Sequence, residues 1–92
     1  MASTRQTTKY QKFFAELGRN VRKLRERDAY SQEDMMSYGW SLNHWQQIEA
    51  GRPITVTTLL RICEVFGVPM HVLVRDLDSY LIGFSSRKKK PR

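Results

Sequence analysis

The sequence predicts a compact all-α domain of five short helices with a basic segment at each end. Apolar residues recur at three- and four-residue spacing through most of the chain, as on the buried face of a helix. No stretch alternates strictly between apolar and polar residues, as a half-buried strand does. Ser, Thr, Gly and Pro stand where helices would begin and end. The length of 92 residues indicates one domain.

The first two helices are expected over 10–27 and 32–38. The apolar set of the first helix is Phe13, Phe14, Leu17, Val21 and Leu24. Ser31 is the expected N-cap of the second helix, because its hydroxyl can accept a hydrogen bond from an unpaired N–H of the first turn. Gly39 is expected to end this helix, since glycine adopts the left-handed conformation that follows a helix. The apolar members of the second helix are Met35, Met36 and Tyr38.

Three further helices complete the expected domain. Ser41 caps a third helix from Leu42 to Glu49 or Ala50, and Gly51 stops it. Thr55 or Thr57 caps a fourth helix that ends at Phe66 before Gly67. Its expected apolar set is Val56, Leu59, Leu60, Ile62, Cys63 and Phe66. Pro69 suits the first turn of a fifth helix that reaches Asp76 and buries Val72 and Leu73.

The net charge of +7 is concentrated at the two ends of the chain. Residues 1–12 hold three basic and no acidic residues, residues 87–92 hold five basic residues, and the stretch between holds eight basic and nine acidic residues. Cationic ends suit a polyanionic partner, because each phosphate neutralised releases counterions. Charged ends that only keep a small protein soluble are the alternative.

Several other classes of protein are not expected. No apolar run is long enough to span a bilayer, and residues 1–12 lack the apolar centre of a secretory signal. The single cysteine, Cys63, excludes an internal disulfide. His44, His71 and Cys63 do not form metal-ligand spacing. We therefore expect no metal, no cofactor, no small-molecule substrate and no enzymatic activity.

The outer face of the third helix carries amides. Trp45 and Ile48 lie close together on a helical wheel and define the inward side, so that Asn43 and Gln47 lie opposite, with Gln46 beside them. An amide can donate and accept together and can bind the N6 and N7 atoms of adenine. This face therefore favours base reading, although a short polar helix can also carry glutamines by chance.

The order of residues from Leu17 to Asp76 strengthens this interpretation. Val21-Arg22-x-Leu24-Arg25 stands in the first helix, Ser31-Gln32-Glu33 opens the second, and Gly39-x-Ser41 forms the turn. Trp45-x-x-Ile48-Glu49-x-Gly51 and Thr58-Leu59-Leu60-x-Ile62-Cys63-x-x-Phe66-Gly67-Val68 follow. In this order the chain resembles the phage-repressor-like (Cro and Xre) helix-turn-helix family. The resemblance implies a lambda-repressor-like fold that binds double-stranded DNA.

The resemblance also implies roles for individual residues. Leu42, Asn43 and Gln47 match the base-reading positions, and Gln46 flanks them. Gln32 and Arg52 match phosphate contacts, to which we add His44. Arg25 and Glu49 match a buried ion pair between the first and third helices. The chain also departs from the pattern of the family it resembles. One residue is missing near the turn, Met36 stands where the family has a small residue, and Trp40 and Trp45 are bulkier than the family's usual aliphatic residues.

The expected organisation has four parts. A basic arm over 1–9 precedes the helix-turn-helix domain over 10–78, and a candidate dimer contact over 79–84 precedes a disordered basic tail over 85–92. The dimer contact would use Tyr80, Leu81, Ile82 and Phe84, which could instead pack on the first helix. The tail would hold phosphates through Lys88, Lys89 and Lys90.

The expected function is a transcriptional regulator, a repressor, which binds a palindromic operator as a homodimer in the cytoplasm, associated with the nucleoid. Two rival functions stay open. The fold could serve as a protein-interaction module or an antitoxin-like partner-binding protein, or the basic ends could coat nucleic acid without sequence preference.

Overall fold

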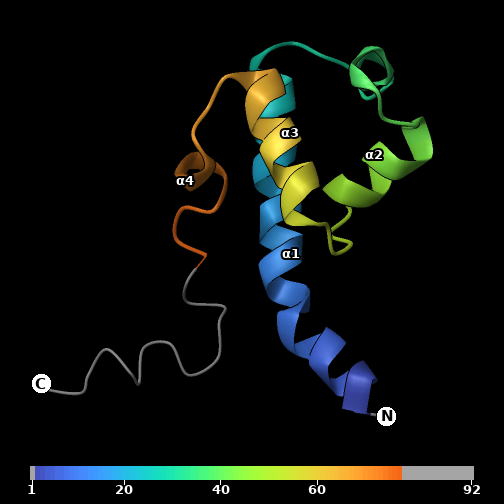
Figure 1. The fold of residues 1–92 in the computed structure, drawn as a ribbon, viewed down its shortest axis with the longest axis vertical. Coiled ribbons are helices and arrows are strands. Elements are labelled where there is room, and N and C mark those ends of the chain that lie inside the picture. The colour runs from blue at the N-terminus through green and yellow to red at the C-terminus, as the bar shows by residue number, and fades with distance from the viewer. Residues whose placement is uncertain (1, 78–92) are drawn as a thin grey trace, which may run out of the picture.

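The computed structural model describes the backbone of residues 2–77 and the side chains of residues 10–77, and it contains five helices in this part of the chain. They are α1 (Ala2–Arg27), the 3-10 helix η1 (Glu33–Tyr38), α2 (Leu42–Glu49), α3 (Val56–Phe66) and α4 (Met70–Leu73) (Figure 1). No strand occurs within residues 2–77. The predicted all-α fold is therefore confirmed.

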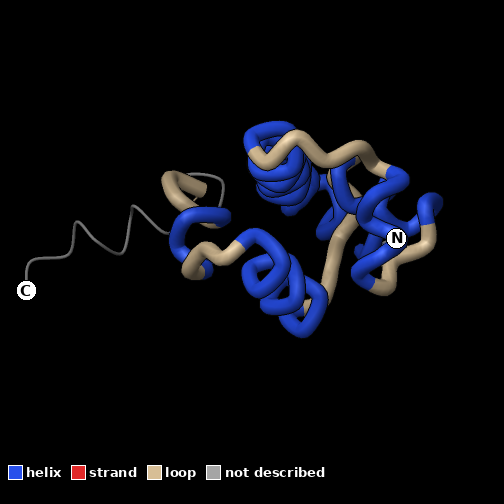
Figure 2. Tube along the Cα trace, turned by 90° about the horizontal axis from the view of Figure 1, so that it is seen from above, coloured by secondary structure: helices blue, strands red, loops and turns tan. Residues whose placement is uncertain are grey.

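α1 is the longest helix, and α2, α3 and α4 all contact it. α3 lies along α1, with η1 and α2 on one side of this pair and α4 on the other (Figures 1 and 2). α1 begins at Ala2, eight residues before the predicted start at Tyr10. The apolar pattern that set the predicted start begins only where the helix reaches the core. No Gly or Pro precedes Tyr10, so nothing in the sequence stops the hydrogen-bond ladder there.

The second helix is a 3-10 helix and not the expected α-helix. The residue directly before η1 is Gln32, whose side chain makes no capping hydrogen bond, so the predicted N-cap Ser31 lies one residue too early. Ser31 still closes this end of the helix: the Asp34 N–H donates to the Ser31 hydroxyl (3.1 Å), and the Ser31 N–H donates to the Asp34 carboxylate (2.7 Å). A 3-10 helix rises about 2.0 Å per residue against about 1.5 Å in an α-helix. The tighter coil therefore covers more length per residue than the predicted helix would.

Two tryptophans and an arginine hold the turn between η1 and α2. Trp40 and Trp45 are buried and meet edge to face, with their ring centroids 5.0 Å apart. The Arg61 guanidinium of α3 lies 4.3 Å from the centroid of the Trp40 ring and donates to the Tyr38 carbonyl at 3.3 Å. The bulk of both tryptophans is thus used to fix the turn that precedes α2.

The starts of α2 and α3 are set by the predicted caps. The Ser41 hydroxyl accepts from the His44 N–H at 3.0 Å, and the Thr55 hydroxyl accepts from the Thr58 N–H at 3.1 Å. Thr55, and not Thr57, is therefore the N-cap of α3. α3 ends at Gly67, which is left-handed (φ +65°) as expected.

The fifth helix is shorter than predicted. α4 covers only Met70–Leu73, follows Pro69 as its N-cap, and gives way to a turn in which Asp76 has φ +64°. The Asn20 side-chain amide of α1 donates to the Leu73 carbonyl at 2.7 Å, which fixes α4 against α1 at the point where it ends. Leu73 is fully buried as expected, whereas Val72 is only partly buried.

The core fills the space between α1 and the other helices. Trp45, Met35, Ile62, Leu73 and Val21 are its largest fully buried side chains. Further buried residues are Leu17, Leu24, Trp40, Ile48, Leu59, Cys63, Phe66 and Leu77. Phe13 and Phe14 pack against this core from α1. The predicted inward face of α1 is thus confirmed.

Some members of the predicted apolar sets are exposed. Met36 and Tyr38 of η1 are 54% and 41% exposed, and Val56 and Leu60 of α3 are 66% and 46% exposed. The apolar spacing of a short helix does not decide which of two adjacent residues turns inward. In η1 only Met35 reaches the core, because the three-residue turn of a 3-10 helix gives a narrower buried stripe.

Candidate nucleic-acid interface

α2 packs on α1 through a contact between two backbones. A Cβ atom added at Gly18 of α1 would lie 2.6 Å from the Glu49 carbonyl oxygen and 2.7 Å from that of Ile48. A Cβ atom added at Gly51 would lie 2.9 Å from the Cα atom of Ala15. These small residues let the end of α2 approach α1 more closely than side chains would allow, which fixes the position of α2.

One face of α2 is buried and the other is open. Trp45 and Ile48 are 0% and 2% exposed, whereas Asn43, His44, Gln46 and Gln47 are exposed. Glu49 is the only acidic residue of the helix, and its side chain is buried. The outer face of α2 therefore carries amides and an imidazole, and no negative charge that would repel a phosphate backbone.

The two amides expected to read bases lie free on this face. Asn43 and Gln47 are one helical turn apart, and neither side chain makes a hydrogen bond to a residue whose side chain the structure describes. Leu42 is half-buried, so only part of its side chain lies at the surface. The structure thus groups Asn43, Gln46 and Gln47 and places Leu42 at the margin of the group.

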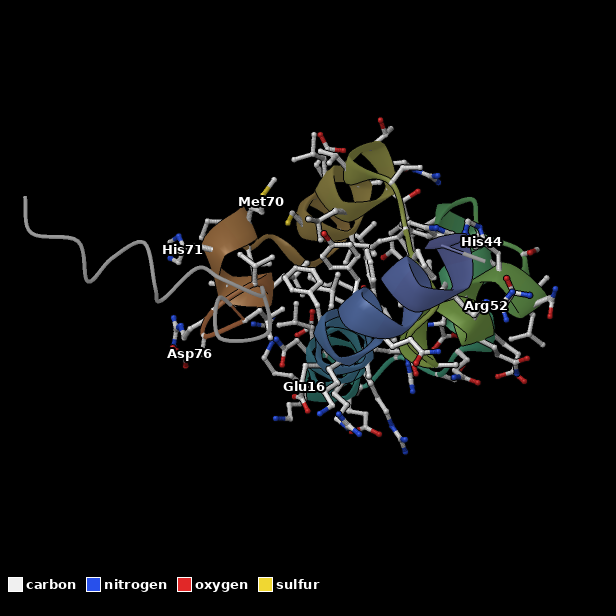
Figure 3. The ribbon with its side chains drawn as sticks, turned by 90° about the horizontal axis from the view of Figure 1, so that it is seen from below. Glu16, His44, Arg52, Met70, His71 and Asp76 are labelled. Atoms are coloured by element: carbon white, nitrogen blue, oxygen red, sulfur yellow. The ribbon has the colours of Figure 1, made fainter. Side chains whose placement is uncertain are left out.

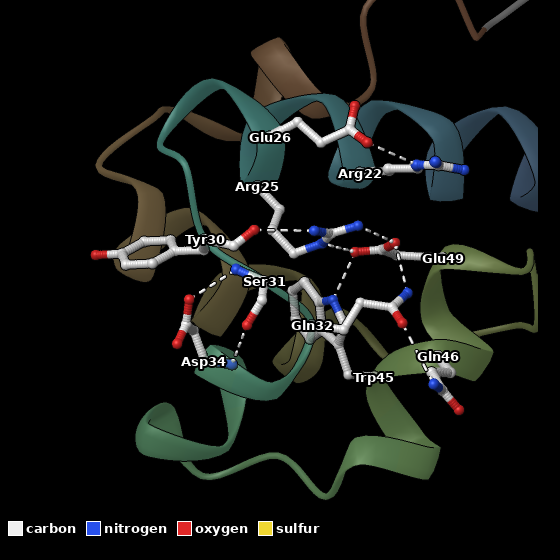
Figure 4. Close-up of polar contacts among 10 residues, drawn as sticks. All are labelled: Arg22, Arg25, Glu26, Tyr30, Ser31, Gln32, Asp34, Trp45, Gln46 and Glu49. Atoms are coloured by element: carbon white, nitrogen blue, oxygen red, sulfur yellow. Dashed lines mark hydrogen bonds and ion pairs between the residues drawn. The ribbon is translucent and has the colours of Figure 1, made fainter.

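Arg25 and Glu49, which the resemblance pairs, form a two-pronged ion pair between α1 and α2. The Arg25 Nε donates to Glu49 Oε2 at 2.5 Å and Nη2 donates to Oε1 at 3.0 Å, while Nη1 donates to the Tyr30 carbonyl at 2.9 Å (Figure 4). The side chains of the pair are 10% and 5% exposed. The two-pronged geometry fixes the rotation of α2 about its axis relative to α1.

The Glu49 carboxylate also accepts from two uncharged donors. The Trp45 indole N–H donates to Oε2 at 2.6 Å, and Gln32 Nε2 donates to Oε1 at 3.0 Å (Figure 4). Burial by itself raises the pKa of Glu49, but the hydrogen bonds from Arg25, Gln32 and Trp45 outweigh it, and the net pKa is lowered. The hydrogen bond to Glu49 in turn raises the pKa of Arg25. Both groups are therefore charged in the folded protein at neutral pH.

Acidification should remove the stability that the Glu49 charge contributes. Because the native pKa lies below the ordinary glutamate value of about 4.3, this contribution is fully present above that pH and is lost as the pH falls through the native pKa. We expect the difference in unfolding free energy between the wild type and Glu49→Gln to be constant near neutral pH. It should shrink below about pH 4 in urea titrations followed by tryptophan fluorescence. A difference that persists unchanged into strong acid would contradict this assignment.

Gln32, the residue expected to contact a phosphate, makes hydrogen bonds within the protein. It is half-buried, its amide nitrogen donates to Glu49, and its amide oxygen accepts from Gln46 Nε2 at 3.3 Å (Figure 4). Both ends of the amide are thus engaged inside the protein. The link to Gln46 was not predicted, since 14 positions separate the two residues.

His44 and Arg52 lie at the same side of the molecule, away from α4 (Figure 3). Both are exposed, and the Arg52 N–H donates to the Gln47 carbonyl at 3.1 Å, which fixes the loop to the end of α2. Lys88, Lys89 and Lys90, and the candidate dimer contacts Tyr80, Leu81, Ile82 and Phe84, lie outside the described residues.

The close contact at Gly18 and Ala15 was missed in the sequence. A glycine inside a helix costs about 1 kcal/mol relative to alanine, so its presence there is itself a sign of close packing. Gly18 stands on the same side of α1 as the inward-facing Leu17 and Val21, and could have been identified on that ground.

Other kinds of site find no support in the described part of the chain. Within it, no three His, Cys, Asp or Glu residues are grouped so that they could hold a metal ion. Cys63 is buried, and burial raises the pKa of its thiol. Among the same residues, no helix has the length and apolar character needed to cross a bilayer.

Comparison with known families agrees with this geometry. A search of curated proteins and a search of solved structures each returned no match. A family model described as a helix-turn-helix domain matches residues 16–77, which is more than half of the chain and includes η1, the turn and α2. The match is consistent with the resemblance to Cro and Xre proteins. The chain therefore belongs to the helix-turn-helix domain family.

Proposed function

We propose that this protein is a sequence-specific DNA-binding transcriptional regulator that inserts α2 into the major groove. The observation that carries the proposal is the outer face of α2: Asn43, Gln46 and Gln47 are exposed together on a helix whose only carboxylate is turned inward. A helix fits the major groove, where amides can pair with base edges. The helix-turn-helix match supports the same role.

Contacts to phosphates would position α2 in the groove. His44 stands on α2 with the amides and Arg52 follows the end of this helix, and an imidazole N–H or a guanidinium can donate to a phosphate oxygen. The basic residues at the two ends of the chain would add affinity that does not depend on sequence, through Lys88, Lys89 and Lys90 in particular. Gln32 would donate its second amide N–H to a phosphate, because its hydrogen bonds to Glu49 and Gln46 use only one N–H and the carbonyl oxygen.

We further propose that the protein acts as a homodimer on a palindromic operator and represses transcription. One reading helix contacts only a few base pairs, so two half-sites about one turn of DNA apart would supply the specificity that a regulator needs. A repressor needs no further surface than the DNA-binding face, because occupancy of the operator alone can exclude other proteins.

Selection from a random duplex library tests the proposal. The wild type should enrich one palindromic motif at physiological salt, and Asn43→Ala/Gln47→Ala should lose the motif, since each good pairing to a base is worth about 1–3 kcal/mol of discrimination. Thr57→Ala, an exposed change on α3 outside the face, is the matched control and should keep the motif. Unselective binding by the wild type would refute sequence-specific reading.

A protein partner is the second candidate function. Val56 and Leu60 are exposed one turn apart on α3, and adjacent exposed apolar side chains favour contact with another protein. Under this alternative, Asn43→Ala/Gln47→Ala would leave binding of the partner protein unchanged, whereas Val56→Asp/Leu60→Asp would abolish that binding.

A further inference from the structure

The two ends of α2 are attached to the rest of the domain in different ways. At the C-terminal end, the Glu49 carboxylate pairs with Arg25 and the Glu49 carbonyl lies against Gly18 of α1. At the N-terminal end, the turn over 38–40 is contacted by Arg61 of α3. The ion pair is buried, whereas Arg61 is exposed. A change at Arg61 can therefore alter the start of α2 without opening the core.

Arg61 touches successive residues of this turn. Its guanidinium carbon lies 4.3 Å from the centroid of the Trp40 ring, and its Nη2 donates to the Tyr38 carbonyl at 3.3 Å. Nη2 also lies 3.0 Å from the position that a Cβ atom at Gly39 would take, so the guanidinium lies directly against the Gly39 backbone. A single side chain of α3 thus holds the backbone just before Ser41, the N-cap of α2.

Trp40 contributes its ring to this contact and not its N–H. The indole N–H of Trp40 is buried and has no hydrogen-bond partner in the described part of the chain. A phenylalanine would avoid the cost of a buried N–H that has no acceptor. The indole, however, attracts a cation over its face more strongly than a phenyl ring does. The Arg61 guanidinium over this face therefore explains why a tryptophan is placed here.

The contact continues from Trp40 into the inward face of α2. Trp40 and Trp45 meet edge to face with ring centroids 5.0 Å apart, and the Trp45 indole N–H donates to Glu49. Arg61, Trp40 and Trp45 therefore form a stack from the surface of α3 to the centre of α2. The first residues of a recognition helix lie nearest the base edges, so a displaced start of α2 would misplace Asn43 in particular.

We propose that Arg61 is a positioning residue for DNA recognition, which fixes the start of α2 through Trp40 and does not itself contact DNA. The inference rests on the proposed function, because it assumes that α2 enters the major groove. The alternative is that Arg61 holds a phosphate. A lost phosphate contact weakens binding to every duplex and lowers the slope of affinity against salt by about one. A displaced α2 weakens binding to the operator alone.

Affinity for two duplexes separates these roles. Arg61→Met keeps most of the aliphatic stem and removes the guanidinium. It should bind the operator selected by the wild type about fivefold more weakly, which corresponds to one cation–ring contact. Its binding to a scrambled duplex and its salt slope should match those of the control Arg75→Met, which loses the same charge. Arg75 is exposed two residues after α4, and α4 lies on the opposite side of α1 and α3 from α2 (Figure 1).

Hydrogen exchange of the two indole protons, followed by NMR without DNA, gives a second measurement. Arg61→Met should speed the exchange of the Trp40 indole proton about fivefold, because local opening of the turn then costs less. The Trp45 indole proton, which is hydrogen-bonded to Glu49, should change by less than about twofold. Equal acceleration of both protons would show that Arg61 stabilises the whole domain and would overturn the inference.

The DNA measurements can also overturn it. Equal operator binding by the wild type and Arg61→Met would do so. An equal loss on both duplexes with a smaller salt slope would do so as well, and would assign Arg61 to a phosphate. Both results leave the proposed function intact, because the wild type still selects an operator. Unselective binding by the wild type would overturn the proposed function together with this inference.

Discussion

Replacing Glu49 with alanine should lower the free energy of unfolding by about 3–5 kcal/mol. The change leaves the guanidinium of Arg25 buried without its counter-charge, and it also removes the acceptor of the Trp45 indole and of Gln32. Breaking a buried pair on one side is costly because the remaining charge stays desolvated. The measurement is urea unfolding at neutral pH, followed by tryptophan fluorescence.

The chain offers a surface pair as the control. Arg22 and Glu26 form an ion pair one turn apart on α1, with the Arg22 Nε 2.9 Å from Glu26 Oε2, and their side chains are 63% and 53% exposed. Exposed pairs of this kind contribute about 0.3–0.5 kcal/mol, so Glu26→Ala should change stability by no more than about 0.5 kcal/mol. Equal losses in Glu49→Ala and Glu26→Ala would show that the buried pair contributes no more than a surface contact.

Gly51→Ala should destabilise the domain by about 2–4 kcal/mol and weaken specific DNA binding with it. Two penalties add at this position. Gly51 has φ +96°, which an alanine adopts only with strain, and the new Cβ would lie 2.9 Å from the Cα atom of Ala15. Backbone atoms cannot move aside as a flexible side chain can, so the end of α2 and the Arg52 loop must shift away from α1.

Gly67→Ala separates the two penalties. Gly67 has φ +65°, but a Cβ atom there would meet nothing within 4 Å. Ala29 already adopts φ +63° in this chain. Gly67→Ala should therefore cost only the conformational strain, about 1 kcal/mol, and leave DNA binding unchanged. If unfolding experiments gave the same loss for both glycines, the contact between α1 and α2 at Ala15 would not limit the approach of the helices.

The helices that were predicted best are those whose ends are set by capping or terminating residues next to them in the sequence. α2 runs from Leu42 to Glu49 as expected, because the Ser41 hydroxyl and Gly51 act on their immediate neighbours. The start of α1 was missed by eight residues because no cap marks it. α4 is shorter than expected, and at its last residue, Leu73, its carbonyl accepts from the Asn20 amide of α1, which is distant in sequence. Contacts with distant residues leave no mark in the local sequence.

The residues of the candidate site could be predicted from the sequence, but most of the hydrogen bonds between them could not. The amides of α2 follow from the helical spacing around Trp45 and Ile48, and the resemblance paired Arg25 with Glu49. The hydrogen bonds of Gln32 were not foreseen, because the direction of an amide depends on its neighbours in space. One such neighbour is a carboxylate 17 positions away and the other an amide 14 positions away.

The burial of Cys63 gives the protein an internal reporter of its own opening. It is the only thiol in the sequence, it lies on the inner face of α3 at 8% exposure, and burial keeps it in the unreactive protonated form. A thiol reagent can therefore react only in molecules whose α3 has come away from the rest of the core. The rate of labelling therefore measures how often α3 detaches from the core, and a slower rate in the presence of DNA would measure how far DNA binding suppresses that motion.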